Sequence, residues 1–292
     1  MCEAGRIMGL KYLITGANGQ LAREFVKKLQ FSGANYFAVS REKLDITDEA
    51  SVRSCFSHIK PDVVLNCAAY NFVDKAETDG ESAMRVNAEA PELLARAAEK
   101  NRAFLVHFGT DYVFDGAKGA PYTESDSPNP LNFYGASKLE GEKRVLQFCT
   151  RSLILRLSWV YGPGRQNFVH KFLNWAASSD ILKISENEIS VPTSADLAAD
   201  ITLKAVRDGL LGRCHLVNSG YCSRFEWAGE IARLRGLKKT LIPVPMADFG
   251  MSAKRPAFSA MSNAFVAREL AVEIPPWQDS LAVFMRALPP DV

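Results

Sequence analysis

The sequence lacks the segments that send a chain into or across a membrane. No apolar run approaches the roughly 20 residues that a membrane-spanning helix needs, and the N-terminus has no apolar core of the kind found in signal peptides. Paired cysteines are missing too, because the six cysteines, at positions 2, 55, 67, 149, 214 and 222, are widely scattered and form no C-x-x-C pair. This argues against zinc ribbons and redox motifs. We expect a cytoplasmic protein with reduced thiols and no membrane partner.

An excess of charge of either sign is also missing. The chain carries 35 Lys plus Arg against 33 Asp plus Glu, a formal net charge of +2, which is too small and too evenly spread for a nucleic-acid-binding surface. The four histidines, at positions 58, 107, 170 and 215, form no metal-ligand spacing. We therefore expect neither a nucleic acid partner nor a bound metal, while an acidic small-molecule substrate stays open.

The length and composition are those of a globular protein of enzyme size. The 292 residues allow one large domain or two modest ones. With 47% hydrophobic and 23% charged residues, the chain is not disordered, collagenous or a coiled coil. Residues 1–8 precede the first apolar segment without periodicity, and they are expected to form a flexible leader.

The first half of the chain alternates short apolar runs with amphipathic stretches, a rhythm typical of parallel strands joined by crossover helices. It predicts strands at 11–15, 35–40, 62–69, 103–109 and 152–160. Helices are expected at 20–30, 48–58, 80–100 and 134–149, where they can cross back over a sheet. The predicted fold class is α/β, a Rossmann-type doubly wound parallel sheet.

After Tyr161 this rhythm degrades into mixed segments and loops, although 194–208 and 226–235 again have the pattern of helices. The sequence therefore predicts a Rossmann domain over residues 1–162. Residues 163–292 are expected to form a smaller, mainly substrate-binding region, with some of its segments packing back on the Rossmann domain.

A glycine-containing turn stands where this fold usually binds a dinucleotide. It follows the first predicted strand and opens the first predicted helix, so that a pyrophosphate can rest on backbone amides. Glycines let such a turn be tight and let the backbone approach the phosphates. The expected cofactor contacts are Gly16, Asn18, Gly19, Gln20 and Leu21. The alternative is an ordinary strand-to-helix turn.

The end of the second predicted strand indicates which dinucleotide is bound. A Rossmann protein specific for NAD usually places a carboxylate there for the ribose hydroxyls, but this chain has Ser40 followed by Arg41. A guanidinium suits a 2′-phosphate that a carboxylate would repel, so residues 1–162 are predicted to bind NADPH, with NADH left open. Arg41 can also be a solvated surface residue. Asp45 and Ile46 are expected beside the adenine, or as a turn and cap before the next helix.

Tyr134 and Lys138 lie four residues apart in a predicted helix, and therefore on one face of it. A phenol of pKa about 10 is roughly three units from neutral pH, and a neighbouring ammonium together with the nicotinamide's positive charge narrows that gap. Tyr134 can then protonate a carbonyl oxygen as hydride arrives. Thr110, at the carboxyl end of a predicted strand, can offer a hydroxyl to the same oxygen. These residues by themselves predict a ketone reductase.

The same residues carry a family resemblance. The glycine turn at 15–19, residues 66–69, Thr110 and the Tyr134-x-x-x-Lys138 pair resemble the extended short-chain dehydrogenase/reductase superfamily. More local motifs resemble the dTDP-4-dehydrorhamnose reductase family. They cover nearly the whole chain, at residues 72–77, 86–91, 110–116, 157–162, 167–169, 192–193, 255–259 and 275–277.

The resemblance implies NADPH-dependent reduction of the 4-keto group of dTDP-4-dehydro-6-deoxy-L-hexose to dTDP-L-rhamnose, for polysaccharide biosynthesis. It implies that Thr110, Tyr134 and Lys138 are catalytic, with Lys138 also holding the nicotinamide ribose. The further cofactor contacts that it implies are Ala68, Ala69, Tyr70 and Asn87. The substrate contacts that it implies are Val73, Asp111, Tyr112, Trp159 and Arg255.

Two of these substrate contacts have a physical role that can be stated, and three have an alternative. Trp159 offers a flat apolar face to a sugar ring, and Arg255 can pair with the nucleotide diphosphate. The alternatives are core packing for Trp159 and Val73, and a surface ion pair for Arg255.

Three departures from the family pattern fall on the substrate side. Gly109 stands where the family commonly has Ser, Asn71 replaces a usual Thr, and residues 187–190 (Asn-Glu-Ile-Ser) replace Asp-Gln-x-Gly. The sugar and the nucleotide base therefore stay open.

Two alternative functions follow. The chain can reduce another keto-deoxysugar nucleotide, or it can be a non-catalytic regulatory subunit, since the same fold resembles the beta subunit of methionine adenosyltransferase. The intact set of Thr110, Tyr134 and Lys138 weighs against the second alternative, although retained residues do not by themselves establish catalysis. A homodimer is left open as the oligomeric state.

Overall fold

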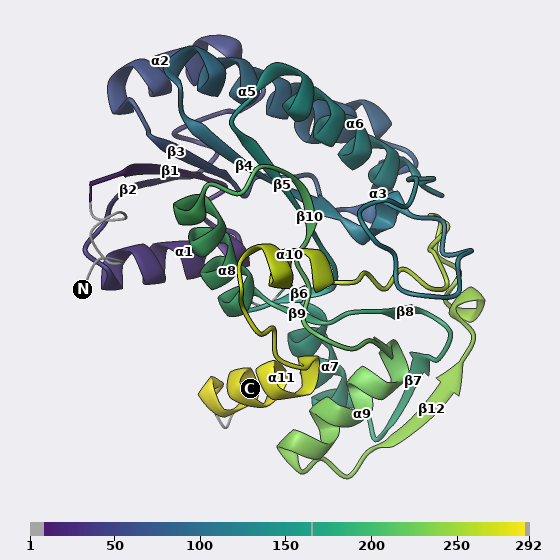
Figure 1. Cartoon of the computed structure of the whole chain (residues 1–292). Coiled ribbons are helices and arrows are strands. Elements are labelled where there is room, and N and C mark those ends of the chain that lie inside the picture. Colours follow the sequence, from purple (N-terminus) through teal and green to yellow (C-terminus); the bar gives the residue numbers. More distant parts are fainter. Residues whose placement is uncertain (1–8, 165, 290–292) are drawn as a thin grey trace.

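Six parallel strands form the central sheet of the protein, in the order β10-β5-β4-β3-β1-β2 (Figure 1). The computed structural model describes residues 9–164 and 166–289, so the leader expected at residues 1–8 lies outside the described residues. The strands of the sheet are β1 (Lys11–Thr15), β2 (Asn35–Val39), β3 (Val63–Asn66), β4 (Phe104–Thr110), β5 (Ser152–Leu157) and β10 (Gly212–His215). The predicted doubly wound α/β fold is confirmed.

The order of the strands reverses at β1. From β1 the chain crosses to β2 on one side, and β3 later pairs with the other side of β1. In open α/β sheets such a switch point leaves a crevice outside the carboxyl ends of the strands, and ligands bind there. Thr15 of β1 and Asn66 of β3 lie opposite each other at this edge, so the crevice opens directly beyond them.

Helices cover both faces of the sheet, because side chains alternate along each strand. Tyr12 and Ile14 pack into the apolar core on one face, and Leu13 packs into the core on the other. The helices of the first face are α1 (Gln20–Phe31), α8 (Ala195–Asp208) and α10 (Ala264–Glu269). Those of the second, at the top of Figure 1, are α2 (Glu49–Ile59), α5 (Ala90–Asn101) and α6 (Phe133–Phe148).

A second group of elements, in the lower part of Figure 1, packs around a core of its own that includes the fully buried Trp227. Its strands β7 and β12 pair in parallel. Its members are α7 (Phe168–Ser178), β7 (Ile181–Ser185), α9 (Arg224–Arg235), β12 (Thr240–Val244) and α11 (Trp277–Ala287). Two short strand pairs join the two groups, β6 (Val160–Tyr161) with β9 (Thr193–Ser194) and β8 (Ile189–Ser190) with β11 (Cys222–Ser223).

Three elements that follow residue 162 pack with the sheet and not with the second core. Strand β10 pairs with β5 at the edge of the sheet, and α8 and α10 belong to the core beneath the sheet. The chain therefore returns to the sheet twice after it has entered the second group of elements.

Three predicted elements were wrong in part. The strand expected at 62–69 ends at Asn66, because the Cys67 N–H donates to the Leu65 carbonyl and the Ala68 N–H donates to the Thr15 hydroxyl. The strand expected at 152–160 ends at Leu157, because the Ser158 hydroxyl turns aside to donate to the Val191 carbonyl at 2.7 Å and Trp159 adopts a positive φ of 42°. The single helix expected at 80–100 is α4 (Gly80–Met84), a π-helical turn η2 (Arg85–Glu89), and then α5. The remaining short helices are α3 (Val73–Ala76) and the 3₁₀ turns η3 (Asp111–Val113) and η4 (Met246–Phe249).

Candidate active site

The turn between β1 and α1 brings two backbone segments unusually close together. Gly16 has a φ of 66°, and a Cβ at this position would lie 2.8 Å from the backbone nitrogen of Ala68. The Gly16 carbonyl accepts a hydrogen bond from the Gly19 N–H at 2.9 Å, and α1 begins at the next residue with no side-chain cap among the described residues. An uncapped helix start beside a glycine turn is the arrangement that binds phosphate groups.

A buried polar network fixes the strand ends behind this turn. The Thr15 hydroxyl donates to Asn66 Oδ1 at 2.7 Å and accepts from the Ala68 N–H at 3.3 Å. The Asn66 amide lies 3.0 Å from His107 Nδ1. Burial holds the pKa of His107 well below its usual range, so the ring is neutral and its Nδ1 accepts from Asn66.

A cavity of about 380 Å³ opens beside the glycine turn. Ten of the predicted cofactor contacts line it, namely Gly16, Asn18, Gly19, Ser40, Arg41, Asp45, Ile46, Ala68, Ala69 and Tyr70. Asp45 also closes a turn, since its carboxylate accepts from the Thr47 N–H at 2.9 Å and from the Thr47 hydroxyl at 2.7 Å. The ends of β1, β2 and β3 thus contribute to one site.

Asn87 lies behind the wall of this cavity. Its side chain is buried and brackets the backbone of Tyr70, accepting from the Tyr70 N–H at 2.9 Å and donating to the Tyr70 carbonyl at 3.0 Å. It also donates to the Ser137 hydroxyl at 3.0 Å. The π-helical turn η2 places it there, in keeping with the frequent occurrence of π turns at functional sites. Asn87 thus fixes a part of the wall.

Thr110, Tyr134 and Lys138 line a second cavity, of about 310 Å³. Thr110 ends β4, and the other two lie in the first two turns of α6. Asn132 caps this helix by accepting from the Gly135 N–H at 2.7 Å, which fixes the turn that carries Tyr134. The same cavity is lined by the first residues of α1, Gln20 and Leu21.

The protonation states of this trio follow from its burial. Burial raises the pKa of Tyr134 to about 12, against a smaller lowering by a hydrogen bond with Thr110. Burial lowers the pKa of Lys138 to about 8, against a raising by the carboxylate of Glu142. The Lys138 ammonium donates to the Phe108 carbonyl at 2.6 Å. At neutral pH, Tyr134 therefore holds a proton that it can donate, and Lys138 is mostly charged.

Asp111 lines the same cavity, but its oxygens are already engaged. Its carboxylate accepts from three hydroxyls, those of Ser190 at 2.9 Å, Ser259 at 2.6 Å and Thr110 at 3.2 Å. Burial raises its pKa to about 6. Asp111 ties the segments around Ser190 and Ser259 to the end of β4, so it shapes the wall of the predicted sugar pocket.

A third cavity, of about 410 Å³, is rich in aromatic and cationic side chains. Four of the predicted substrate contacts line it, namely Val73, Tyr112, Trp159 and Arg255. It is also lined by Phe168, Lys171, Trp175, Lys183, Glu188, Arg224, Trp227 and Phe249. Four cations stand there beside one carboxylate, a balance that suits a ligand carrying phosphate groups.

The three cavities share walls. Gln166 lines all three of them, Asn71 lines the glycine-turn cavity and the catalytic cavity, and Trp159 lines the catalytic cavity and the aromatic one. The Tyr134 hydroxyl donates to Asn71 Oδ1 at 3.4 Å, a long contact. The cavity of Thr110, Tyr134 and Lys138 therefore adjoins both of the other cavities.

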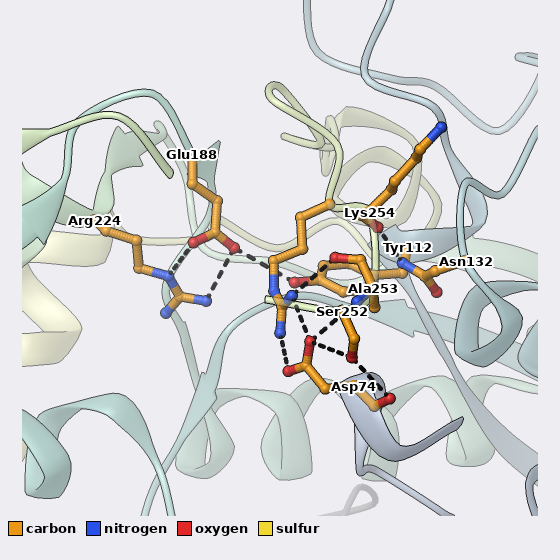
Figure 2. Close-up of polar contacts among 9 residues, drawn as sticks. Asp74, Tyr112, Asn132, Glu188, Arg224, Ser252, Ala253 and Lys254 are labelled. Carbon is orange, nitrogen blue, oxygen red and sulfur yellow. Dashed lines mark hydrogen bonds and ion pairs between the residues drawn. The ribbon is translucent and has the colours of Figure 1, made fainter. Parts of the chain in front are cut away.

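The indole of Trp159 is covered more than the sequence indicates. It stacks on Trp227 with ring centroids 5.5 Å apart and an interplanar angle of 7°. The Arg224 guanidinium lies over the Trp159 ring and is held by Glu188, with Nε and Oε2 3.1 Å apart. Figure 2 shows Glu188 between Arg224 and Tyr112, whose hydroxyl donates to Glu188 at 3.4 Å.

Arg255 forms a two-pronged ion pair with Asp74, with nitrogen-to-oxygen distances of 3.0 and 2.6 Å. Asp74 also accepts from the Ala253 N–H at 3.1 Å (Figure 2). The hydrogen bond from Arg255 lowers the pKa of Asp74 to about 2. The pair joins α3 to the loop before Arg255, and it engages the guanidinium that the sequence predicted for a diphosphate.

Sequence reasoning missed two ion pairs in these walls. Glu188 and Arg224 meet across two distant segments, and Glu142 and Arg156 form a fully buried pair beneath the catalytic cavity. Spacing in the sequence indicates only that Glu142 shares a helix face with Lys138, and it gives no signal of either ion pair.

Within residues 9–164 and 166–289, no group of three or more His, Cys, Asp or Glu side chains is placed to hold a metal ion. Nor does this part of the chain contain a helix with the length and apolar character needed to cross a membrane. Its cysteines are free thiols, at Cys55, Cys67, Cys149, Cys214 and Cys222.

Comparison with known proteins places these features in a family. The model of the RmlD substrate binding domain matches residues 10–289. The dTDP-4-dehydrorhamnose reductase of Burkholderia thailandensis is 34% identical over 96% of this chain and 99% of its own length. A Streptomyces antibioticus protein described as a probable dTDP-4,6-dihydroxy-2-methyloxan-3-one 4-ketoreductase is 35% identical over 87% of both chains.

A solved structure is similar over the same extent. The dTDP-4-dehydrorhamnose reductase of Bacillus anthracis, solved in complex with NADP, superposes with a TM-score of 0.93 at 32% identity. The superposition covers 96% of this chain and 99% of that one.

Proposed function

The chain belongs to the RmlD substrate-binding-domain family, and from this premise we propose that it uses NADPH to reduce the 4-keto group of dTDP-4-dehydro-6-deoxy-L-hexose to dTDP-L-rhamnose. The observation that carries the proposal is the convergence of Thr110, Tyr134 and Lys138 in a cavity that shares walls with two others. One neighbouring cavity adjoins a glycine turn, and the other is aromatic and cationic.

The proposed chemistry assigns one role to each member of the trio. NADPH, when bound, supplies the hydride that the carbonyl carbon accepts. Tyr134 donates its phenolic proton to the carbonyl oxygen, and the Thr110 hydroxyl forms a hydrogen bond to that oxygen. The Lys138 ammonium stabilises the phenolate left on Tyr134. One hydride and one proton convert the ketone to the alcohol.

The glycine-turn cavity supports NADPH as the dinucleotide. A side chain at Gly16 would clash with the Ala68 backbone, and a glycine at this turn lets the backbone approach a pyrophosphate closely. Arg41 lines the cavity at the end of β2 and provides a cation for a 2′-phosphate. Ser40, which also lines it, donates its hydroxyl to Glu42. We propose that this cavity holds the adenosine half of the cofactor.

The aromatic cavity supports a nucleoside diphosphate sugar as the substrate. Lys171, Lys183 and Arg224 supply cations for the diphosphate, and the aromatic side chains supply flat faces for the base. We propose that Val73 and Tyr112 contact the sugar, because both line this cavity and both belong to one apolar cluster with Tyr134.

The proposal is tested by removing the phenolic hydroxyl. Tyr134→Phe should lower kcat by roughly a thousandfold, within the range for general acid catalysis, while NADPH binding persists in a fluorescence titration. Tyr221→Phe is the matched control, since Tyr221 is half exposed and far from the trio in the sequence. Turnover retained by Tyr134→Phe would contradict the assignment of the acid.

Reduction of a related keto-deoxysugar nucleotide is the second candidate. Glu188 and Ser190, in the segment that departs from the family pattern, contact Tyr112 and Asp111. The departure therefore acts on side chains expected around the sugar. Comparison of kcat/KM for dTDP-, UDP- and GDP-linked keto-sugars separates the two candidates, with the dTDP-linked hexulose expected to be the best substrate.

The alternative of a non-catalytic regulatory subunit predicts the opposite result for NADPH oxidation. NADPH binding without oxidation of NADPH by any keto-sugar nucleotide, together with co-purification of a methionine adenosyltransferase, would support it. Activity of the wild-type chain with a keto-sugar excludes a purely regulatory role.

The cellular compartment, the roles of the two regions and the oligomeric state are also proposals. The five free thiols fit a reducing compartment, and we propose the cytoplasm. We propose that residues 1–162 bind NADP and that 163–292 mainly bind substrate, with α8, β10 and α10 supporting the sheet. A homodimer is proposed as the state in solution, and sedimentation equilibrium tests it against the 32.2 kDa mass of one chain.

A further inference from the structure

Beneath the catalytic cavity lies an ion pair that the proposed chemistry does not use. Glu142 of α6 and Arg156 of β5 are both fully buried. Three hydrogen bonds join them, from Arg156 Nε at 3.0 and 3.1 Å and from Arg156 Nη2 at 2.7 Å. Burying two charges is costly before their attraction is counted, and apolar residues of similar volume at these two positions would often make the fold equally stable. The position of the pair needs another explanation.

The pair occupies space that a side chain at position 109 would fill. Gly109 lies opposite Arg156 in the sheet. A Cβ on Gly109 would overlap Glu142 Oε1 and would lie 2.9 Å from Arg156 Cγ. The absence of a side chain at position 109 therefore lets the Glu142 carboxylate press against β4. The neighbouring residues in this strand are Phe108, which binds Lys138, and the catalytic Thr110.

Glu142 is also the carboxylate whose charge acts on Lys138. The two lie four residues apart in α6 and share a helix face. Glu142 opposes the lowering of the Lys138 pKa by burial. Arg213 of β10 comes within 3.6 Å of Glu142, so two guanidinium groups hold this carboxylate in place.

Other titratable groups lie near Lys138, but Glu142 is the charged group that acts on the Lys138 pKa. His107 of β4 is buried with its pKa held well below its usual range by burial and by Lys138 itself, so it is neutral. Tyr134, one turn earlier in α6, is a neutral phenol. Asp111 of η3 acts on Tyr134 and is bound by three hydroxyls. Glu142 is thus the carboxylate that favours the charged form of Lys138.

We propose that Glu142 is a positioning residue for the reaction, whose carboxylate, held by Arg156 in the space left by Gly109, keeps the Lys138 ammonium charged and in place. Lys138 donates to the Phe108 carbonyl on one side of Gly109, and Thr110 lies on the other side. The pair thus fixes the end of β4, where the Phe108 carbonyl accepts from Lys138 and where Thr110 lies. This inference rests on the proposed function for its effect on turnover, but its first test does not depend on any substrate.

The first test measures the titration of Lys138 directly. The ¹³Cε resonance of Lys138, assigned by its loss in Lys138→Met, is followed against pH in protein labelled at lysine. Glu142→Gln keeps the shape of the side chain and removes its charge. The midpoint for Lys138 should fall by about one pH unit or more, as expected when an opposite charge is lost at short range. An unchanged midpoint in folded Glu142→Gln protein would overturn the proposal.

A matched control lies on the same helix. Glu140→Gln also removes a carboxylate from α6, but Glu140 is partly exposed and pairs with Arg144 at 3.0 Å. The Lys138 midpoint should be the same in Glu140→Gln and in the wild type. An equal change of midpoint in both variants would show that the helix responds to charge in general, and it would overturn the specific role of Glu142.

A second variant covers the case in which Glu142→Gln does not fold because it leaves Arg156 unpaired. Gly109→Ser keeps both charges and restores the residue that is common in the family. Because its Cβ overlaps the present position of Glu142 Oε1, the carboxylate must move, and the Lys138 midpoint should change. A midpoint identical to that of the wild type would overturn the proposal.

Turnover gives the second readout. If Lys138 must be charged, kcat falls as pH rises through its pKa, and this basic limb should move to lower pH in Glu142→Gln. At a pH well above the midpoint, kcat should drop about tenfold if the midpoint falls by about one pH unit, with a smaller loss at acid pH. A merely structural role would lower kcat equally at every pH. Inactive wild-type protein in which Glu142→Gln lowers the Lys138 midpoint as expected would contradict the proposed reductase and leave the positioning role standing.

Discussion

The guanidinium carbon of Arg224 lies 3.6 Å from the centroid of the Trp159 ring. The attraction between a cation and an indole ring amounts to about 2 kcal/mol when the pair is desolvated. Glu188 also forms an ion pair with this guanidinium. The ring that was expected to receive the sugar therefore already carries a guanidinium over it. Arg224 lines the aromatic cavity with Trp159, which also lines the cavity of Thr110, Tyr134 and Lys138.

Arg224→Ala should raise KM for the nucleotide sugar by about tenfold or more, because a charge-assisted hydrogen bond to phosphate contributes about 1.5–3 kcal/mol. NADPH affinity should not change, since Arg224 lines the aromatic cavity and is absent from the described wall of the glycine-turn cavity. Steady-state kinetics and a cofactor titration measure the two quantities. Arg233→Ala, an exposed position on the same helix, is the control. An unchanged KM in Arg224→Ala would remove Arg224 from the substrate site.

Gly16→Ala should abolish measurable NADPH binding. The new Cβ would sit 2.8 Å from the Ala68 backbone, and the positive φ of 66° disfavours any side chain by about 1–2 kcal/mol. Gly33→Ala separates these effects, because Gly33 has a φ of 70° with open space around it. Gly16→Ala should lose more stability than Gly33→Ala in urea titrations, because the backbone contact at Ala68 adds to the cost of the positive φ. If Gly33→Ala loses NADPH binding as well, the contact at Ala68 is not the cause.

Arg41→Ala should weaken NADPH binding about tenfold or more and leave NADH binding nearly unchanged, because only NADPH carries the 2′-phosphate that the guanidinium would pair with. Titration of both cofactors by nicotinamide fluorescence measures the ratio. Lys43→Ala removes a neighbouring exposed cation and controls for general charge. Equal weakening of NADPH and NADH binding would rule out a phosphate contact by Arg41.

Asp74→Asn should remove part of the acid sensitivity of folding. The pKa of Asp74 in the folded chain is about 2, mainly because of Arg255, and it lies below the unfolded value of about 3.9. A carboxyl with a lowered pKa stabilises the fold above its unfolded pKa, and that stability is lost as pH falls towards 2. Urea unfolding should show a larger gap between the wild type and Asp74→Asn at about pH 6 than at about pH 3. A gap that is constant with pH would contradict the ion pair.

Much of this architecture could be predicted because local patterns determine it. The strand and helix rhythm of the first half predicted five of the six strands of the sheet, and the family motifs predicted a match that extends over residues 10–289. Gly16, Thr110 and Tyr134 could be placed at strand ends and on a helix because turn chemistry and helix spacing are properties of neighbouring residues. Their convergence then follows from the parallel sheet.

Features that depend on distant partners could not be predicted. The strand expected to run to residue 160 stops early because Ser158 finds Val191, 33 residues away in the sequence. Arg255 was expected to meet a diphosphate, but its partner in the fold is Asp74, 181 residues away. Glu142 gave no signal of its pairing with Arg156, since a helix and a later strand bring the two together.

The most direct test of the proposed reaction is the loss of nicotinamide absorbance when the purified protein meets NADPH and dTDP-4-keto-6-deoxy-L-hexulose, repeated with NADH in place of NADPH. We expect rapid oxidation of NADPH in proportion to the keto-sugar supplied, with slower oxidation of NADH. Absence of oxidation in protein that demonstrably binds NADPH would contradict the proposed reaction.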